Sequence, residues 1–175
     1  MKNNKKILIT AGPTYERIDP VRFVGNYSSG KMGLALVDEC LKKGYQVELV
    51  LGPISELLLA KYGSKTDNLN ITHIESANDM YLACQKIYPQ VDGAILCAAV
   101  ADFTPETVAG NKIKRKGDEL VIRLKPTQDI AASLGKIKTS EQFLAGFALE
   151  TNDELQNAKD KLRRTRAVPP RPSRG

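Results

Sequence analysis

Residues 92–100, Asp-Gly-Ala-Ile-Leu-Cys-Ala-Ala-Val, form the nearly unbroken apolar run that decides the fold class. A run without alternating polar positions is typical of a central parallel strand that is buried on both faces of its sheet. Shorter apolar or β-branched segments at 5–11, 46–51, 69–75 and 142–149 are predicted strands of the same sheet. Helical patterns lie between them, so the chain is predicted to be an α/β protein. We expect a doubly wound, Rossmann-like, mainly parallel sheet with helices on both faces.

Apolar spacing and end signals locate the helices. Leu34, Val37 and Leu41 recur at helical spacing, and Gly44 is the expected C-cap of that helix. Ser76 is the expected N-cap of another helix, which should end before Pro89. The other helices are predicted over 54–62, 129–137 and 152–164, and a long loop over 12–29.

A hairpin is predicted within residues 112–124. Lys116-Gly117-Asp118 is a turn signal, so we expect two antiparallel strands on either side of it. Lys114, Arg115 and Lys116 place three like charges at the tip, with no apolar anchor. We expect a mobile β-hairpin lid that becomes ordered when an anion binds, and the alternative is a solvated loop without a role.

Length and composition restrict the class of protein. The chain has 175 residues, of which 42% are hydrophobic and 26% charged, as expected for one soluble domain. No apolar run approaches the roughly 20 residues that cross a bilayer, and no signal-peptide core is present. We therefore expect a cytoplasmic protein with no membrane partner. Cys40, Cys84 and Cys97 lack a paired spacing and are predicted to be buried or inert thiols.

The net charge of +6 does not indicate a nucleic-acid partner. From Lys159 onward there are seven Lys or Arg residues and one acidic residue, which account for the whole net charge. The rest of the chain is neutral, so no basic groove is expected.

Ligands of doubly wound sheets bind beyond the carboxyl ends of the strands, near the point where the strand order reverses. The loops at that edge are predicted to be 11–30, 52–54, 98–112, 125–129 and 147–153.

Residues 25–33, GNYSSGKMG, match a P-loop pattern except that Met32 replaces the hydroxyl residue that holds magnesium. The segment also comes well after the first strand instead of directly behind it, so a Walker-type NTPase is disfavoured. Hydroxyls, amides and a lysine at a helix N-terminus would suit an anion. A Ser-capped helix with a glycine for close packing explains the same residues equally well.

Two further patterns have a functional and a structural interpretation. Tyr27 and Lys31 have the spacing of the Tyr/Lys pair of short-chain dehydrogenases, but no Gly-rich dinucleotide motif follows the first strand. An NAD(P)-binding oxidoreductase is therefore only the alternative. Asp102, after the small residues 98–101 at the end of the 92–100 run, either anchors a flat ligand or is a turn residue. His73 is the only histidine and has no catalytic partner at a suitable spacing, so it is interpreted as structural.

Four segments together, AGPTYERIDPVRFVGNYSSGKMG (11–33), CAAVADF (97–103), NKIKRK (111–116) and GFALETN (146–152), resemble the phosphopantothenate–cysteine ligase family of coenzyme A biosynthesis. The resemblance runs from Lys6 to about Arg164, and Met32 is expected in this family. It implies a ligase that uses CTP with Mg²⁺. Phosphopantothenate would form an acyl-cytidylate with release of pyrophosphate, and L-cysteine would then displace CMP. Positioned donors and cations suit both steps.

The resemblance also implies roles for single residues. Asn26 would act on the acyl-cytidylate and Lys112 at the nucleotide phosphates, with the metal ligands unknown. Phe147 and Lys161 have structural alternatives, core packing and a solvated helix face. The implied nucleotide-binding residues are Leu96, Cys97, Ala98, Asp102, Lys112, Gln128, Asp129, Ile130, Ala131, Phe147 and Lys161, and the implied phosphate-binding residues are Gly12, Ser28, Ser29, Gly30, Lys31 and Gly33.

The family resemblance also sets expectations for the chain as a whole. Bacterial members are usually fused behind a flavin-dependent decarboxylase domain, while nothing in this chain is expected to bind flavin. Members form homodimers. The domain is assigned to 1–164, and the Pro- and Arg-rich segment 165–175 is predicted to be a disordered tail. Thr165 and Arg166 replace a Lys-Asn pair of the family, so we expect a nucleotide site with little turnover and a weakened dimer. A fully competent ligase and a binding-only paralogue are the alternatives.

Overall fold

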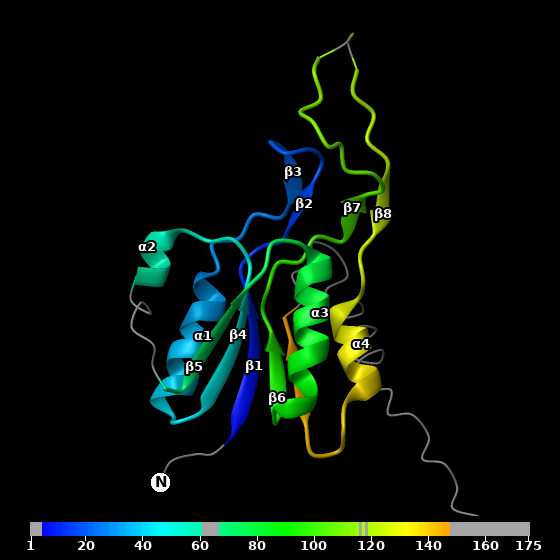
Figure 1. The fold of residues 1–175 in the computed structure, drawn as a ribbon. Coiled ribbons are helices and arrows are strands. Elements are labelled where there is room, and N and C mark those ends of the chain that lie inside the picture. Colours follow the sequence, from blue (N-terminus) through cyan, green and yellow to red (C-terminus); the bar gives the residue numbers. More distant parts are fainter. Residues whose placement is uncertain (1–4, 61–66, 116, 118, 148–175) are drawn as a thin grey trace, which may run out of the picture.

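The computed structural model describes residues 5–60, 67–115, 117 and 119–147. Its centre is a five-stranded sheet in the order β5-β4-β1-β6-β9, in which every neighbouring pair is parallel (Figure 1). The predicted doubly wound topology is therefore confirmed. The strands are β5 (Leu69–His73), β4 (Gln46–Leu51), β1 (Lys6–Ala11), β6 (Gly93–Leu96) and β9 (Phe143–Gly146).

Alternation along β1 builds two separate core layers. Ile7, Ile9 and Ala11 pack on the face that α1 (Lys31–Lys42) covers, with α2 (Glu56–Leu59) beside it. Leu8 lies on the opposite face, under α3 (Ala77–Ile87) and α4 (Ile130–Ile137). Figure 1 shows the helices on the two sides of the sheet. Both faces of the central strand are thus buried, which explains its apolar composition.

The helix ends follow the local signals in most places. Gly44 has a φ of 80°, and its N–H donates to the carbonyl of Leu41 while Tyr45 donates to Cys40, as in a Schellman C-cap. Ser76 caps α3 in a reciprocal box with Asp79. α3 ends at Ile87, before Pro89 as predicted, and Pro89 lies in a short 3-10 turn, Tyr88–Gln90, that follows the helix. The helix predicted over 54–62 is shorter in the structure, where α2 covers only Glu56–Leu59. Residues 61 and 62 lie outside the described part of the chain.

A Ser cap for α1 was one of the two interpretations of residues 25–33, and it is not observed. The N-cap is Gly30, with a φ of 73° and no side-chain cap. Positive φ is accessible to glycine without steric cost, which explains the residue at this position.

The predicted loop 12–29 contains a small antiparallel hairpin. β2 (Tyr15–Arg17) pairs with β3 (Phe23–Gly25), and the turn that joins them contains the buried side chain of Asp19. The run 92–100 was expected to be the central strand, but β1 is central and β6 already ends at Leu96. Beyond it, the N–H of Ala98 donates to the hydroxyl of Thr10 instead of continuing the ladder.

The strands predicted on either side of Lys116–Asp118 are misplaced. We call residues 106–123, between β7 (Phe103–Pro105) and β8 (Leu124–Pro126), the excursion. Strand pairing occurs only at its base, between β7 and β8, within the described residues. Among the described residues from 106 to 123 there is no strand, because the first arm bonds elsewhere. The N–H of Ala109 donates to Ile18 and that of Ile113 donates to Asp19, so the arm lies on the β2–β3 turn.

Two sequence predictions fall on residues that the structure does not describe, namely the helix over 152–164 and the tail 165–175. Within the described residues, no helix has the length and apolar character needed to cross a membrane.

Candidate nucleotide site at the switch point

The strand order reverses between β1 and β6, and the loops that leave these two strands lie against each other. The N–H of Ala99 donates to the carbonyl of Gly12 at 2.9 Å, and Pro13 and Ala99 form a parallel bridge. The N–H of Ala101 donates to the hydroxyl of Thr14 at 3.0 Å. This is the position where doubly wound sheets bind ligands, as the sequence predicted.

Two buried threonines shape this meeting point, and the sequence analysis missed them. Thr10 is 2% exposed, and its Oγ1 accepts from the N–H groups of Cys97 at 3.1 Å and Ala98 at 3.2 Å. Thr14 is fully buried and holds Ala101 in the same way. The signal that could have found them is a hydroxyl residue at the end of an otherwise apolar buried strand.

These contacts decide what the loop can offer to a ligand. The N–H groups of Cys97, Ala98 and Ala99 all have acceptors within the protein. The family resemblance implies that Leu96, Cys97 and Ala98 bind the nucleotide. Because these donors are engaged, carbonyl oxygens are the groups that this part of the loop can present.

Asn26 is anchored to the same loop. It follows directly after β3, and its Nδ2 donates to the carbonyl of Val100 at 2.9 Å. A carboxamide nitrogen carries two hydrogens, so one donor of Asn26 is engaged here. Asp102 lies two residues further along and is exposed. The structure therefore brings Asn26 and Asp102 to one place from segments far apart in the sequence.

The start of α4 completes this side of the site. The N–H of Thr127 donates to the carbonyl of Asp102 at 2.9 Å, and its hydroxyl donates to that of Ala101 at 2.7 Å. Asp129 is the N-cap of α4 and accepts from the N–H of Ala132 at 2.9 Å. Ile130 is only 6% exposed and belongs to the core, so any ligand contact there would have to come from its backbone.

Beyond the sheet, Phe147 lies beside the end of β6. Its N–H donates to the carbonyl of Leu96 at 3.2 Å, and its side chain is 51% exposed. Among the described residues the side chain of Phe147 is therefore not packed in the core, which was its structural alternative. Lys161 lies outside the described residues.

The predicted phosphate-binding residues gather around the N-terminus of α1, with one exception. Ser28 and Ser29 line a cavity of about 220 Å³ together with Ile54. Gly12 and Gly30 cross closely there, and a Cβ on Gly30 would come within 3.5 Å of the Cα of Gly12. Lys31 is the first residue of the helix and is exposed. Gly33 instead packs against Ala11 on β1.

Lys112 occupies a different element, the first arm of the projecting excursion. Its side chain is exposed, and no hydrogen bond or ion pair within the described residues joins it to the loops at the switch point. Its neighbour Ile113 is held through both backbone groups: the N–H donates to Asp19 at 3.0 Å, and the carbonyl accepts from Arg22 at 2.7 Å. The position of Lys112 therefore depends on that attachment.

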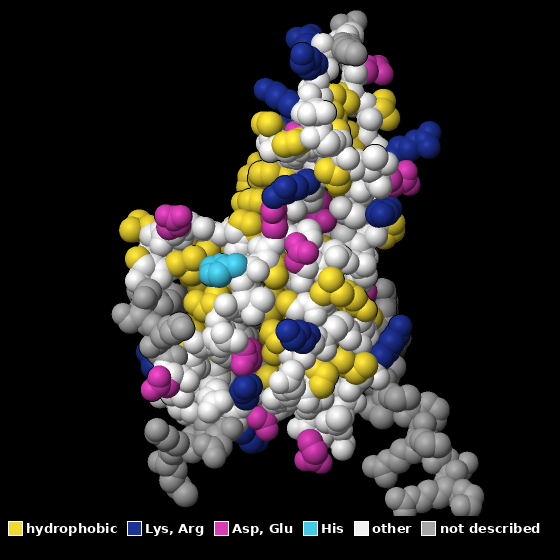
Figure 2. All heavy atoms as spheres, viewed as in Figure 1, with side chains coloured by type: hydrophobic (Ala, Val, Ile, Leu, Met, Phe, Trp, Pro, Cys, Tyr) yellow, Lys and Arg dark blue, Asp and Glu magenta, His cyan; other side chains and the backbone are white. Residues whose placement is uncertain are grey.

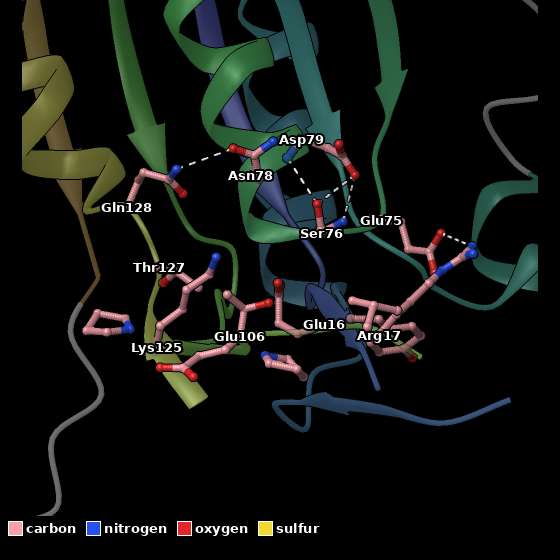
Figure 3. Close-up of a pocket in the computed structure, with 15 residues that line it drawn as sticks. Glu16, Arg17, Glu75, Ser76, Asn78, Asp79, Glu106, Lys125, Thr127 and Gln128 are labelled. Carbon is pink, nitrogen blue, oxygen red and sulfur yellow. Dashed lines mark hydrogen bonds and ion pairs between the residues drawn. The ribbon is translucent and has the colours of Figure 1, made fainter. Parts of the chain in front are cut away.

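A second, larger cavity of about 550 Å³ lies between β2, the start of α3 and the base of the excursion (Figure 3). Arg17 and Glu75 form a bidentate pair at 2.7 and 2.6 Å, which holds the pKa of Glu75 below its usual range. Glu16 is 3% exposed and accepts from the N–H of Ala77 at 2.8 Å. Of the residues predicted for the site, only Gln128 lines this cavity. The polar side chains that line this cavity mainly bond one another, so we prefer the switch point as the ligand site.

The thiols and the potential metal ligands add little to the site. All three cysteines are free; Cys40 and Cys84 are buried, as predicted, and Cys97 is partly exposed. Burial raises the pKa of Cys84 to about 12. In the described ranges, no three His, Cys, Asp or Glu side chains are grouped as metal ligands.

Residues 2–168 match the family of DNA/pantothenate metabolism flavoprotein C-terminal domains. The chain is 43% identical over 158 residues to the coenzyme A biosynthesis bifunctional protein CoaBC of Haemophilus influenzae, covering 90% of this chain and 38% of that protein. It is 50% identical over 162 residues to a cysteine/cysteine sulfinic acid decarboxylase of an unknown prokaryotic organism, covering 93% and 44%. The chain thus spans less than half the length of these relatives.

Solved structures agree with the fold. The crystal structure of the C-terminal domain of CoaBC is 41% identical, with a TM-score of 0.74 over 92% of this chain and 72% of that one. A Cab2 mutant in complex with phosphopantothenate-cysteine has a TM-score of 0.76 over 94% of this chain and 70% of that one. At 21% identity, this second likeness concerns the fold alone.

Proposed function

Because the chain belongs to the family of DNA/pantothenate metabolism flavoprotein C-terminal domains and is homologous to the C-terminal domain of CoaBC, we propose that it is a ligase of coenzyme A biosynthesis that joins 4'-phosphopantothenate to L-cysteine with CTP. The observation that carries the proposal is the anchoring of Asn26 on the loop of Asp102, at the switch point of a sheet that matches that domain.

In the first step, a carboxylate oxygen of phosphopantothenate forms a bond to the α-phosphorus of CTP, and pyrophosphate leaves. Negative charge on the phosphates calls for cations and N–H donors. The N-terminus of α1 and the side chains of Ser28, Ser29 and Lys31 are placed to supply them. Lys112 is the further cation that we assign to this step.

In the second step, the cysteine amine attacks the acyl carbon, loses a proton, and CMP leaves with the bonding electrons of the broken C–O bond. The carbonyl oxygen becomes negatively charged at the tetrahedral stage. Asn26 keeps its Nδ2 on the carbonyl of Val100, which leaves the second hydrogen of the amide for this oxygen.

Acceptor groups on the loop after β6 support cytosine as the base. With the N–H groups of Cys97 and Ala98 bonded to Thr10, the loop presents carbonyls, and Asp102 adds a carboxylate. Cytosine carries an exocyclic amino group, whereas uracil has an oxygen at that position. We therefore expect CTP to bind more tightly than UTP, and more tightly than the larger ATP. Calorimetric titration with the three nucleotides checks this, and equal affinities would contradict it.

Magnesium would enter as part of the nucleotide substrate. Mg²⁺ in nucleotide sites is commonly held by substrate phosphates together with one or two carboxylates. Asp102 is assigned here to the base, so we assign the metal to the substrate phosphates.

The deciding experiment supplies the chain with MgCTP, phosphopantothenate and cysteine, and follows pyrophosphate and CMP separately. The expected result is release of both at a low rate, with pyrophosphate alone when cysteine is omitted. Asn26→Ala should keep pyrophosphate release but lower CMP release by about 10²–10³-fold. Equal loss of both products would remove Asn26 from the second step, and nucleotide binding without either product would indicate a binding-only paralogue.

The 50% identical relative named as a decarboxylase supplies the competing activity. The same preparation is incubated with cysteine and with cysteine sulfinate, and carbon dioxide is measured. We expect none above background, and release without CTP would contradict the ligase assignment.

A further inference from the structure

A buried carboxylate joins the turn between β2 and β3 to the excursion that carries Lys112. Asp19 is 1% exposed. Its Oδ1 accepts from the N–H groups of Val21 at 2.8 Å and Arg22 at 2.9 Å, which closes the turn. Its Oδ2 accepts from the guanidinium of Arg22 and from the N–H of Ile113.

The same unit holds the other side of the Ile113 peptide. Nη2 of Arg22 donates to the carbonyl of Ile113 at 2.7 Å. Both backbone groups of Ile113 are therefore bonded to one ion pair that is 91 to 94 positions away in the sequence. We call Asp19, Arg22 and the backbone of Ile113 the clasp.

The clasp lies between the two residues assigned to the chemistry. On one side, Ile113 directly follows Lys112. On the other side, the turn leads into β3, which ends at Gly25 directly before Asn26. β3 pairs with β2 through its backbone, and the side chain of Asn26 is bonded to the carbonyl of Val100, so hydrogen bonds hold this path at both ends.

The arm has few other supports. Within its described residues, no ladder joins the two arms between Thr107 and Ile122, and a second tie is the bond from Ala109 to Ile18. A lysine on such an arm would sample many positions without the clasp. A shift of about 1 Å in a catalytic group can cost about 100-fold in rate.

We propose that Asp19 is a positioning residue of the ligase, which holds Lys112 over the nucleotide phosphates through the clasp and sets its place relative to Asn26. This inference rests on the proposed function. If Asp19 had only a structural role, substituting it would lower the stability of the fold. In the molecules that do fold, the contribution of Lys112 to the rate would then be unchanged.

The test is a double-mutant cycle on pyrophosphate release. Asp19→Asn keeps the size of the side chain but removes the charge that pairs with Arg22. We expect kcat for pyrophosphate release to fall by about 10- to 100-fold. In a Lys112→Ala background, the same substitution should change the rate less than about twofold, because the group that it positions is gone.

Two further variants separate positioning from stability. Ile113→Pro removes the N–H that donates to Asp19 and leaves the turn 18–22 intact, so it should reproduce the loss even where Asp19→Asn folds poorly. Glu48→Gln is the matched control, since Glu48 is a partly buried carboxylate that bonds Lys6 and Asn70 within the sheet. It should leave pyrophosphate release within about twofold of the original chain.

The outcomes are distinct for the two proposals. Equal fractional losses with and without the Lys112 side chain, or an unchanged rate in Ile113→Pro, would overturn the positioning role while leaving the ligase assignment in place. Absence of pyrophosphate release from the unmodified chain would overturn the ligase assignment, and the positioning role with it.

Discussion

At the scale of single residues, the hydroxyl of Thr10 determines where β6 ends. Its Oγ1 is the acceptor for the N–H of Ala98, while Cys97 also has the Thr10 carbonyl at 3.2 Å. A β-branched residue suits the strand, so valine would fit the backbone there equally well. The hydroxyl is needed only to hold the loop after β6, which carries Asp102, through its bonds to the N–H groups of Cys97 and Ala98.

We predict that Thr10→Val destabilises the protein by about 1–3 kcal/mol, because the partly buried N–H of Ala98 loses its acceptor. It should also weaken CTP binding, since the loop after β6 loses its register. Denaturant unfolding and calorimetry measure the two effects. Thr72→Val on β5 is the control, because the hydroxyl of Thr72 has no hydrogen bond among the described residues. Equal losses of stability in the two variants would contradict the role of Thr10.

Asp19 makes the stability of the turn depend on pH. Hydrogen bonds from Arg22 hold the pKa of Asp19 well below its ordinary value of about 3.9. A carboxylate with a lowered folded pKa stabilises the fold above its unfolded pKa, and that stabilisation is lost as pH falls through the folded pKa. We predict that the stability advantage of the unmodified chain over Asp19→Asn is full at pH 6 and narrows below about pH 4. Urea titrations at several pH values check this, and a constant difference would contradict it.

At the scale of elements, α1 packs closely against β1 because Gly33 stands at the point of contact. A Cβ on Gly33 would come within 2.4 Å of the Cβ of Ala11, which is below any normal contact. Gly33 was predicted to bind phosphate, but its place in the structure explains it as the close-packing glycine of the alternative interpretation. The helix could not otherwise bring Gly30 and Gly12 together.

Gly33→Ala should therefore push α1 away from β1 and cost about 1–3 kcal/mol. Gly110→Ala is the control, since nothing lies within 4 Å of the position that its Cβ would take. Thermal unfolding of both variants measures the difference. A phosphate-binding role alone would instead lower CTP affinity and leave stability unchanged.

The excursion from β7 to β8 projects beyond the sheet (Figure 1), and Lys and Arg side chains gather toward its far end (Figure 2). We predict that trypsin cuts at Lys114 or Arg115 at least several-fold more slowly when MgCTP is bound, because the anion draws the lid onto the site. The cleavage rate at Lys86 on α3 is the internal control. Unchanged cleavage at the tip with saturating CTP would favour a solvated loop.

At the scale of the whole molecule, the excursion exposes an unusual amount of apolar surface. Val121 is 80% exposed, and Val108 and Leu120 are each 51% exposed. Hydrophobic side chains lie along one side of this projection in Figure 2. Such surfaces commonly mark interfaces, and family members are expected to form homodimers.

We therefore predict self-association through this arm, and sedimentation velocity should show a dimer at micromolar concentration. Val121→Asp should shift the distribution toward monomer because it places a charge in the contact. Leu82→Asp is the control, with an exposed leucine on α3 away from the arm. A monomer in the unmodified chain, or equal effects of the two variants, would contradict the prediction.

The sequence alone determined the alternation of strands and helices, the buried apolar run that contains β6, the caps at Ser76 and Gly44, and the edge of the sheet where the predicted site lies. These features depend on interactions within a few residues, or on the periodicity of a buried face, both of which are visible along the chain. The family resemblance added Asn26 and Lys112 and gave Asp102 a nucleotide-binding role, because their motifs stand in the right order.

Only the tertiary structure decided where β6 ends, that residues 12–29 contain a hairpin, and that the arm with Lys112 is fastened to Asp19. It also decided that the N–H groups of Cys97 and Ala98 are unavailable to a base. The hairpin pairs two strands that are close together in the chain, but the other features rest on hydrogen bonds between groups about 90 positions apart, such as Thr10 with Ala98 or Asp19 with Ile113. The reason is energetic: a buried polar group must find a partner, and the folded neighbours of a residue, not its position in the chain, determine which partner is within reach.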